Sequence, residues 1–156
     1  MAKTPYPKIK HHKPTVSPEQ EAYVNLLRTA DALTHGIEQV LRPASLSGTQ
    51  YNVLRILRGA GPAGLSCREV GQLMITRDPD ITRLLDRLEA RGLVARVREK
   101  RDRRVITGRI TEAGLQLVAE LDAPVEAMHR RTLGPLGTRR LRALIRLLEE
   151  ARVTSG

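Results

Sequence analysis

Apolar side chains recur every three or four residues along much of the chain, a spacing typical of helices that bury one face. The first and longest run follows Ser17 and Pro18, which together form a favoured helix start, and it stops before Pro43. Its apolar positions are Tyr23, Leu26, Leu27, Ala30, Leu33, Ile37, Val40 and Leu41. The pattern therefore predicts a long amphipathic helix near the N-terminus.

Shorter apolar runs follow three further capping signals. Ser47 and Gln50 form a capping box, in which each side chain binds a backbone group at the start of a helix. Thr111 and Thr138 are suited to cap the two helices that follow the middle of the chain. Pro124 falls inside the first of these two and is expected to kink or interrupt it. The chain is thus predicted to be mainly helical.

The middle of the chain predicts a helix, a tight turn and a second helix. Ser66 and Glu69 form a capping box for the first helix, and Asp78 with Pro79 marks the start of the second. Gly92 is expected to end the second helix. The first helix would bury Val70, Leu73 and Met74. The second would bury Ile81, Leu84, Leu85 and Leu88 and expose Thr82, Arg83, Asp86 and Arg87.

A short charged hairpin is predicted to follow this pair of helices. Residues 93–98 alternate apolar and basic side chains, as a half-buried strand does, and residues 105–110 supply a partner strand. Residues 99–103 form a turn that is dense in charge. A helix-turn-helix followed by a two-stranded wing is a fold suited to entering DNA grooves. We therefore predict a mainly α fold with a small β wing.

The segments ITRLLDRLEARGLVAR (81–96) and DRRVITGRIT (102–111) resemble the MarR-type winged-helix transcription regulators. The wing pattern of that family is D-x-R followed by a short strand that ends in an apolar residue and threonine. The matching residues are Asp102, Arg104, Ile110 and Thr111. The resemblance extends from about residue 20 to residue 152. The chain departs from the family at residues 77–80, Arg-Asp-Pro-Asp, where small polar residues are more usual.

The resemblance implies a homodimer that binds double-stranded DNA and usually represses transcription. It assigns residues 17–42 and 112–152 to dimerisation and residues 47–111 to the winged helix-turn-helix, within one domain from 17 to 152. The recognition helix, 78–91, would enter the major groove, and the wing, 93–110, would lie at the minor groove. Without the resemblance, a helical bundle that closes within one chain would also cover the apolar faces of the terminal helices.

Several side chains of the recognition helix and wing are candidates for DNA contact. Arg77, Thr82 and Arg83 lie near the start of the helix and are candidates for base contacts, whereas Arg87 lies a turn further on and suits a phosphate. Either Arg101 or Arg103 is expected to enter a narrow minor groove. Each arginine is alternatively a solvated surface residue. The full set is Ser66, Arg77, Thr82, Arg83, Arg87, Lys100, Arg101, Arg103 and Arg104, with Asp102 and Thr111 assigned to wing architecture.

Composition agrees with a DNA-binding protein of one domain. The 156 residues carry 27 basic and 17 acidic side chains, a net charge of +10, which favours polyanions and would also suit an acidic membrane surface. No apolar run approaches the roughly 20 residues of a membrane span. A core without phenylalanine or tryptophan must be aliphatic, and a single cysteine, which allows no disulfide within the chain, fits the cytoplasm.

Three weaker signals lie outside the predicted DNA-binding surface. Residues 1–16 form a basic tail, either solvated or an additional arm for phosphate or the partner subunit, and its adjacent His11 and His12 are a poor metal signal. In the family, small and often aromatic effectors bind near the dimerisation helices, which makes His35 and Tyr51 polar candidates here. Both are alternatively ordinary core residues. Cys67, near a helix start, is either a redox sensor or a small helix residue.

The sequence contains no pattern that indicates catalysis. No serine, histidine and aspartate set is suited to nucleophilic attack, and the glycines at 59–64 lack the lysine of a phosphate-binding loop. We therefore predict no enzyme activity, no cofactor and no metal. The alternative functions are a basic architectural protein that binds nucleic acid without sequence preference, and a winged helix used only for protein contacts.

Overall fold

The computed structural model describes residues 17–77, 80–99, 102 and 104–153 of the chain. The chain divides into two compact units, residues 1–33 and 34–156. Helix α1 (Pro18–Leu41) begins in the first unit and ends in the second. The Ser17 hydroxyl accepts a hydrogen bond from the Gln20 amide at 3.2 Å, which confirms the predicted helix start. Within the first unit, α1 exposes three large apolar side chains, Tyr23, Leu26 and Leu27.

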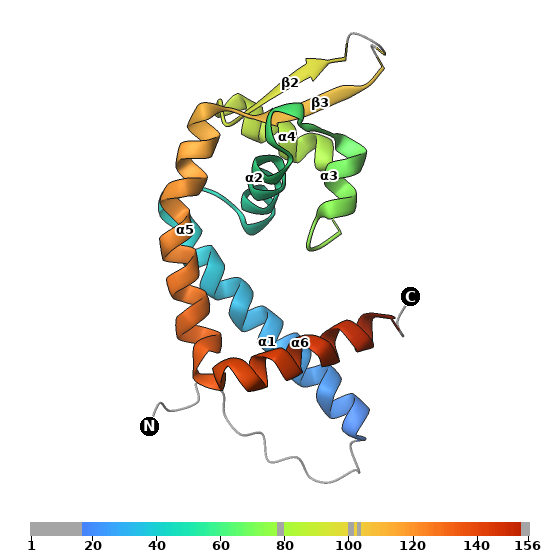
Figure 1. The fold of residues 1–156 in the computed structure, drawn as a ribbon, viewed down its shortest axis with the longest axis vertical. Coiled ribbons are helices and arrows are strands. Elements are labelled where there is room, and N and C mark those ends of the chain that lie inside the picture. Colours follow the sequence, from blue (N-terminus) through green and yellow to red (C-terminus); the bar gives the residue numbers. More distant parts are fainter. Residues whose placement is uncertain (1–16, 78–79, 100–101, 103, 154–156) are drawn as a thin grey trace. The chain divides into compact units, whose positions relative to one another are not determined.

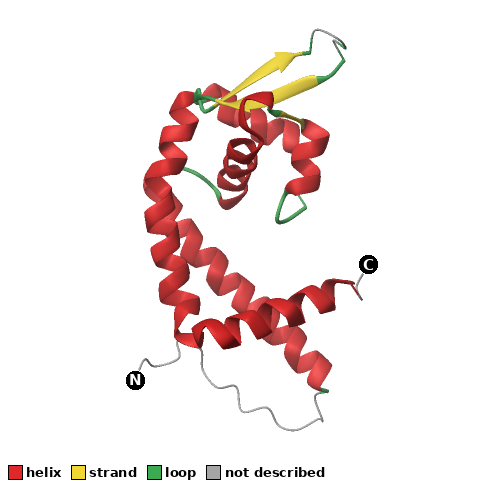
Figure 2. Cartoon of the chain, viewed as in Figure 1, coloured by secondary structure: helices red, strands yellow, loops and turns green. Residues whose placement is uncertain are grey.

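The second unit is mainly helical with one small sheet, as predicted (Figures 1 and 2). A short 3-10 turn, η1 (Arg42–Ala44), leads from α1 to α2, and two others, η2 (Gly61–Ala63) and η3 (Gly134–Leu136), follow α2 and α5. The longer helices are α2 (Gly48–Ala60), α3 (Cys67–Leu73), α4 (Ile81–Ala90), α5 (Glu112–Leu133) and α6 (Gly137–Val153). The strands are β1 (Leu65–Ser66), β2 (Val94–Arg98) and β3 (Ile106–Ile110).

The sheet has three antiparallel strands in the order β1-β3-β2, one more than the sequence predicted. β2 and β3 form the wing hairpin, with Val94 opposite Ile110 and Arg96 opposite Gly108. β1 pairs Leu65 with Gly108. A two-residue strand is too short to show alternation, so its pairing was not visible in the sequence. Gly64, just before β1, has φ +69°, and a Cβ there would lie 2.4 Å from the Gly108 carbonyl oxygen.

The core of the second unit is aliphatic, as the composition required. Helices α2, α4 and α5 meet there with residues from the base of the wing, and Tyr51 is its one aromatic member. The predicted buried face of α4 is confirmed for Leu84, Leu85 and Leu88. The predicted face of α3 is only partly correct, because Val70 is buried whereas Leu73 is 57% exposed. Leu73 is the last residue of α3, and the third predicted residue, Met74, is half-buried against the core.

A bidentate ion pair joins α2 to α5 at the surface of this core. The Arg58 guanidinium donates to both carboxylate oxygens of Asp122, at 2.7 and 3.0 Å. The hydrogen bonds from Arg58 lower the pKa of Asp122 below its usual value. The pair therefore remains charged at neutral pH and holds the two helices in one register.

The start of α5 is fixed to the base of the wing. The Thr111 hydroxyl donates to the Gly92 carbonyl at 2.6 Å and accepts from the Gly114 amide at 3.1 Å, which confirms the predicted cap. The Thr111 amide donates to the Leu93 carbonyl at 3.1 Å. At Gly114 a Cβ would lie 2.3 Å from the Leu93 carbonyl oxygen, so α5 and β2 approach each other closely here. We call these contacts the α5–wing junction.

Two predictions about the terminal helices need correction. α5 continues through Pro124 without interruption. The proline is exposed, so water can satisfy the carbonyl that loses its partner. α6 begins at Gly137, and Thr138 lies inside the helix instead of capping it. In the described part of the chain, no helix is long and apolar enough to cross a membrane.

Candidate nucleic-acid interface

The predicted recognition helix is α4, and it is shorter than the sequence suggested. It spans Ile81–Ala90 instead of residues 78–91, and Asp80 is its N-cap. The Asp80 carboxylate accepts a hydrogen bond from the Arg83 amide at 2.9 Å. Asp78 and Pro79, the predicted start, lie outside the described residues. The predicted end is confirmed, since Gly92 follows the helix with φ +70°.

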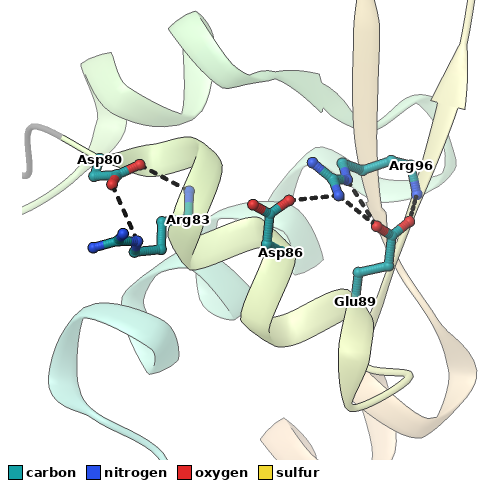
Figure 3. A network of polar contacts seen from close by, with 5 residues as sticks. All are labelled: Asp80, Arg83, Asp86, Glu89 and Arg96. Atoms are coloured by element: carbon teal, nitrogen blue, oxygen red, sulfur yellow. Dashed lines mark hydrogen bonds and ion pairs between the residues drawn. The ribbon is translucent and has the colours of Figure 1, made fainter.

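α4 separates apolar and polar side chains onto opposite faces. Its three leucines are buried in the core, and Thr82, Arg83, Asp86 and Arg87 are exposed. Arg83 is further held by its own cap, because its Nε lies 3.5 Å from a carboxylate oxygen of Asp80 (Figure 3). The Arg83 side chain remains 70% exposed, so its guanidinium can also meet a ligand.

Side-chain hydrogen bonds fix both the start of α3 and the turn between α3 and α4. Ser66 and Glu69 form the predicted capping box of α3, and the hydrogen bonds from Ser66 lower the pKa of Glu69. The Ser66 hydroxyl is thereby engaged with Glu69, at 2.8 Å, and a DNA contact would have to share it. Asn52 on α2 accepts from the Ile75 amide at 2.8 Å and fixes the turn. Arg77 is exposed at the end of that turn.

Asn52 was not identified from the sequence. It lies 23 residues before its partner, and no local motif marks a contact of that kind.

The described part of the wing turn is organised by Asp102. Its carboxylate accepts from the Arg104 amide at 3.0 Å, and its carbonyl accepts from the Val105 amide at 3.0 Å. Arg104 is exposed. On the adjoining strand, Thr107 donates to Glu99 at 2.8 Å. Lys100, Arg101 and Arg103 lie outside the described residues, so their predicted contacts remain predictions.

Arg96 on β2 joins the wing to α4, a role that no motif in the sequence indicated. Its Nη2 lies 2.6 Å from Asp86 and 2.6 Å from Glu89, and its Nε donates to Glu89 at 2.9 Å (Figure 3). These contacts lower the pKa of Glu89 and raise the pKa of Arg96. The only signal in the sequence was an arginine among alternating residues, which resembles any exposed strand position.

The candidate effector residues and the candidate redox residue differ in their exposure. Tyr51 is buried in the core, and burial raises the pKa of its hydroxyl. The Arg55 guanidinium carbon lies 6.0 Å from the centre of the Tyr51 ring. His35 is exposed on α1. Cys67 is the first residue of α3, half-buried and not in a disulfide.

Comparison with known proteins gives consistent matches over most of the chain. The model of the MarR family matches residues 44–105. A MarR transcription factor from Planctomyces limnophilus is 44% identical, covers 85% of this chain and 96% of its own, and has a TM-score of 0.67. The transcriptional repressor IacR of Pseudomonas putida is 28% identical over 142 residues, 89% of this chain and 84% of IacR.

A further solved structure is BpsR from Bordetella bronchiseptica, whose DNA binding is regulated by 6-hydroxynicotinic acid. It is 26% identical, covers 90% of this chain and 98% of its own, and has a TM-score of 0.78. The three relatives each cover at least 85% of this chain, so their similarity extends beyond residues 44–105.

Proposed function

Because the chain belongs to the MarR family of DNA-binding transcriptional regulators, we propose that it acts as a homodimeric repressor that binds an inverted-repeat operator. It is not an enzyme. The observation that carries the proposal is the exposed face of α4, where two arginines and a threonine stand on a helix fixed by its buried leucines. A bound dimer would block access of the polymerase to the promoter, and IacR is named as a repressor. Because it must reach the chromosome, we place it in the cytoplasm.

Exposed apolar side chains on the terminal helices support the proposed dimer. In the first unit, α1 exposes Tyr23 and Leu27 by 63% and 54%, and in the second unit α6 exposes Ile145 and Leu147 by 52% and 63%. Large apolar side chains that remain exposed in one chain are suited to cover by a second copy. A two-fold dimer would place two α4 helices in successive major grooves, about 10 base pairs apart.

We assign the DNA contacts to α4 and the wing according to their chemistry. Thr82 and Arg83 near the start of α4, with Arg77 before it, would reach base edges, and Arg87 would bind phosphate. Net charge supports this assignment, since +10 favours binding to the DNA backbone through release of counterions. In the wing, Lys100, Arg101, Arg103 and Arg104 would follow the minor groove.

Selection of bound duplexes from a random DNA pool, at near-physiological salt, tests the proposed function directly. We expect enrichment of an inverted repeat with half-sites about one helical turn apart. Retention of DNA without any enriched motif would contradict the proposal and favour a non-specific architectural protein. Failure to retain DNA would favour a winged helix that contacts only other proteins.

We further propose that a small, largely apolar effector releases the operator. Tyr51 offers one hydroxyl within an aliphatic core, a common arrangement in ligand sites, and His35 adds an exposed imidazole on α1. The regulation of BpsR by 6-hydroxynicotinic acid is a precedent in a related protein. Loss of operator binding on addition of such compounds, without loss of the folded state, is the expected response.

Replacing Arg83 with alanine should relax specificity at one position of each half-site. Arginine commonly donates two hydrogen bonds to guanine, and their loss costs about 1–3 kcal/mol of discrimination against the wrong base. Fluorescence anisotropy with the selected operator and single-base variants measures this effect.

Arg87→Ala is the matched control for Arg83→Ala, because it removes the same charge from the same face of α4. It should weaken binding to all these duplexes alike and reduce the salt slope by about one. If the wild type and Arg83→Ala discriminate equally between the operator and its single-base variants, Arg83 does not contact a base.

A further inference from the structure

We infer that Arg96 is a positioning residue that fixes the wing relative to the recognition helix, and this inference rests on the proposed sequence-specific DNA binding. We call its contacts with Asp86 and Glu89 the Arg96 clamp. The clamp joins β2 to α4, so it connects the element proposed for the minor groove with the element proposed for the major groove (Figure 3).

The Arg96 clamp fixes the orientation of β2 relative to α4 as well as the distance between them. Arg96 reaches Glu89 through Nε at 2.9 Å and Nη2 at 2.6 Å, and its backbone amide donates to the other oxygen of Glu89 at 3.2 Å. The same Nη2 lies 2.6 Å from Asp86. Two carboxylates hold the planar guanidinium, and Glu89 also binds the backbone of β2. The strand therefore has little freedom to rotate relative to α4.

The position of Arg96 along β2 makes it the outermost described tie between wing and helix. Val94, Arg96 and Arg98 share one face of the strand. Val94 is buried in the core at the base of the wing, and Arg98 is exposed, with no ion pair to another described residue. Beyond Arg96 the hairpin also exposes Val97, Val105 and Ile106. The clamp therefore holds the outer wing from the β2 side, while the pairing of Ser66 with Thr107 holds it from the β3 side.

The Arg96 clamp also offsets negative charge on the exposed side of α4, which we propose to face DNA. Asp86 lies on the same exposed face as Arg83 and Arg87, and an unpaired carboxylate there would repel phosphate. Arg96 carries one positive charge against the two carboxylates, so it offsets part of their negative charge from the wing. Its own side chain is only 23% exposed, so while it holds both acids it acts on DNA through α4 and β2 and not by direct contact.

A charge-balanced double variant, Glu89→Gln with Arg96→Gln, tests the role in positioning. It removes one negative and one positive charge, so the net charge stays at +10. We expect the ratio of operator affinity to random-duplex affinity to fall about tenfold, because base contacts need the helix and wing in one geometry. The salt slope of random-duplex binding should not change, since no phosphate contact is lost.

Arg98→Gln is the matched control, because it replaces an arginine on the same face of the same strand. It should leave the affinity ratio unchanged and lower the salt slope by about one if Arg98 meets phosphate. Arg96→Lys, which keeps the charge and loses the fork, should show a smaller fall of the ratio than the double variant. Circular dichroism and thermal unfolding confirm that each variant is folded before binding is compared.

An unchanged affinity ratio in the folded double variant would reduce the clamp to a surface ion pair and overturn the inference. A salt slope that falls as in Arg98→Gln would show that Arg96 contacts phosphate itself and would also overturn it. If the wild type binds operator and random duplexes equally, the proposed function fails, and this is known before any variant is measured.

Discussion

The double variant Ile145→Glu with Leu147→Glu should be a folded monomer with little affinity for the operator. Both side chains are more than half exposed in the single chain, so glutamate is tolerated there, but a dimer would bury the new charges. A monomer binds one half-site, and the advantage of linked binding, about 100- to 10,000-fold, is lost. Sedimentation should give a mass near 17.4 kDa instead of twice that value. Anisotropy should show the loss with the full operator but not with a half-site.

Ala63→Glu with Ala90→Glu controls for the added negative charge. Both alanines are exposed, and they lie outside residues 17–42 and 112–152, the segments assigned to dimerisation. This variant should remain dimeric and lose only the part of the affinity that follows from net charge, which salt screens. Operator affinity that survives in a monomeric Ile145/Leu147 variant, or a monomeric wild type, would contradict the proposed dimer.

Replacing Gly114 with alanine should destabilise the protein strongly, although alanine is the better helix former. The new Cβ would lie 2.3 Å from the Leu93 carbonyl oxygen and 2.7 Å from Ile110 Cγ1, and the carbonyl belongs to backbone that cannot move aside easily. Overpacking of this kind costs about 3 kcal/mol, which exceeds the gain of about 1 kcal/mol in helix propensity. The net loss is about 2 kcal/mol, and for a chain of this length the expected fall in Tm is about 4–8 °C.

Gly59→Ala, in the last turn of α2, is the control for this steric argument. A Cβ at Gly59 would meet nothing within 4 Å, so only the propensity gain applies and Tm should rise. Calorimetry of the wild type, Gly114→Ala and Gly59→Ala measures the three Tm values. A Gly114→Ala variant that is as stable as Gly59→Ala would show that the α5–wing junction accommodates a methyl group.

Local signals in the sequence were sufficient to locate most of the elements. The boxes at Ser47 and Ser66 and the cap at Thr111 are formed as predicted, because each depends on residues at most three positions apart. The leucines of α4 also follow their pattern, since a helix with one apolar face has only one way to bury it. The remaining side of α4, which we propose to face DNA, is therefore identified by the same pattern.

Features that depend on distant partners were missed or misplaced. β1 exists because Leu65 meets Gly108, and Arg96 matters because Asp86 and Glu89 reach it from another element. The N-cap was assigned to Asp78 because Pro79 follows it, whereas the Asp80 carboxylate is the one that binds the Arg83 amide. A sequence motif shows which residues are able to cap, but tertiary packing decides where the helix begins.

At the α5–wing junction, α5 and the wing hairpin are joined so that a rotation of one moves the other. The longer element is α5, 22 residues or about 33 Å of continuous helix. The shorter element is the hairpin, whose five-residue strands extend about 17 Å. If Thr111 is the fixed point, a rotation of α5 and the hairpin by about 10° displaces the far end of the hairpin by about 3 Å, the length of a hydrogen bond. The same rotation would move the far end of α5 by about 6 Å. A displacement of the terminal helices would therefore reach the wing at about half its size, which is still enough to break the contacts that we propose between the wing and a groove.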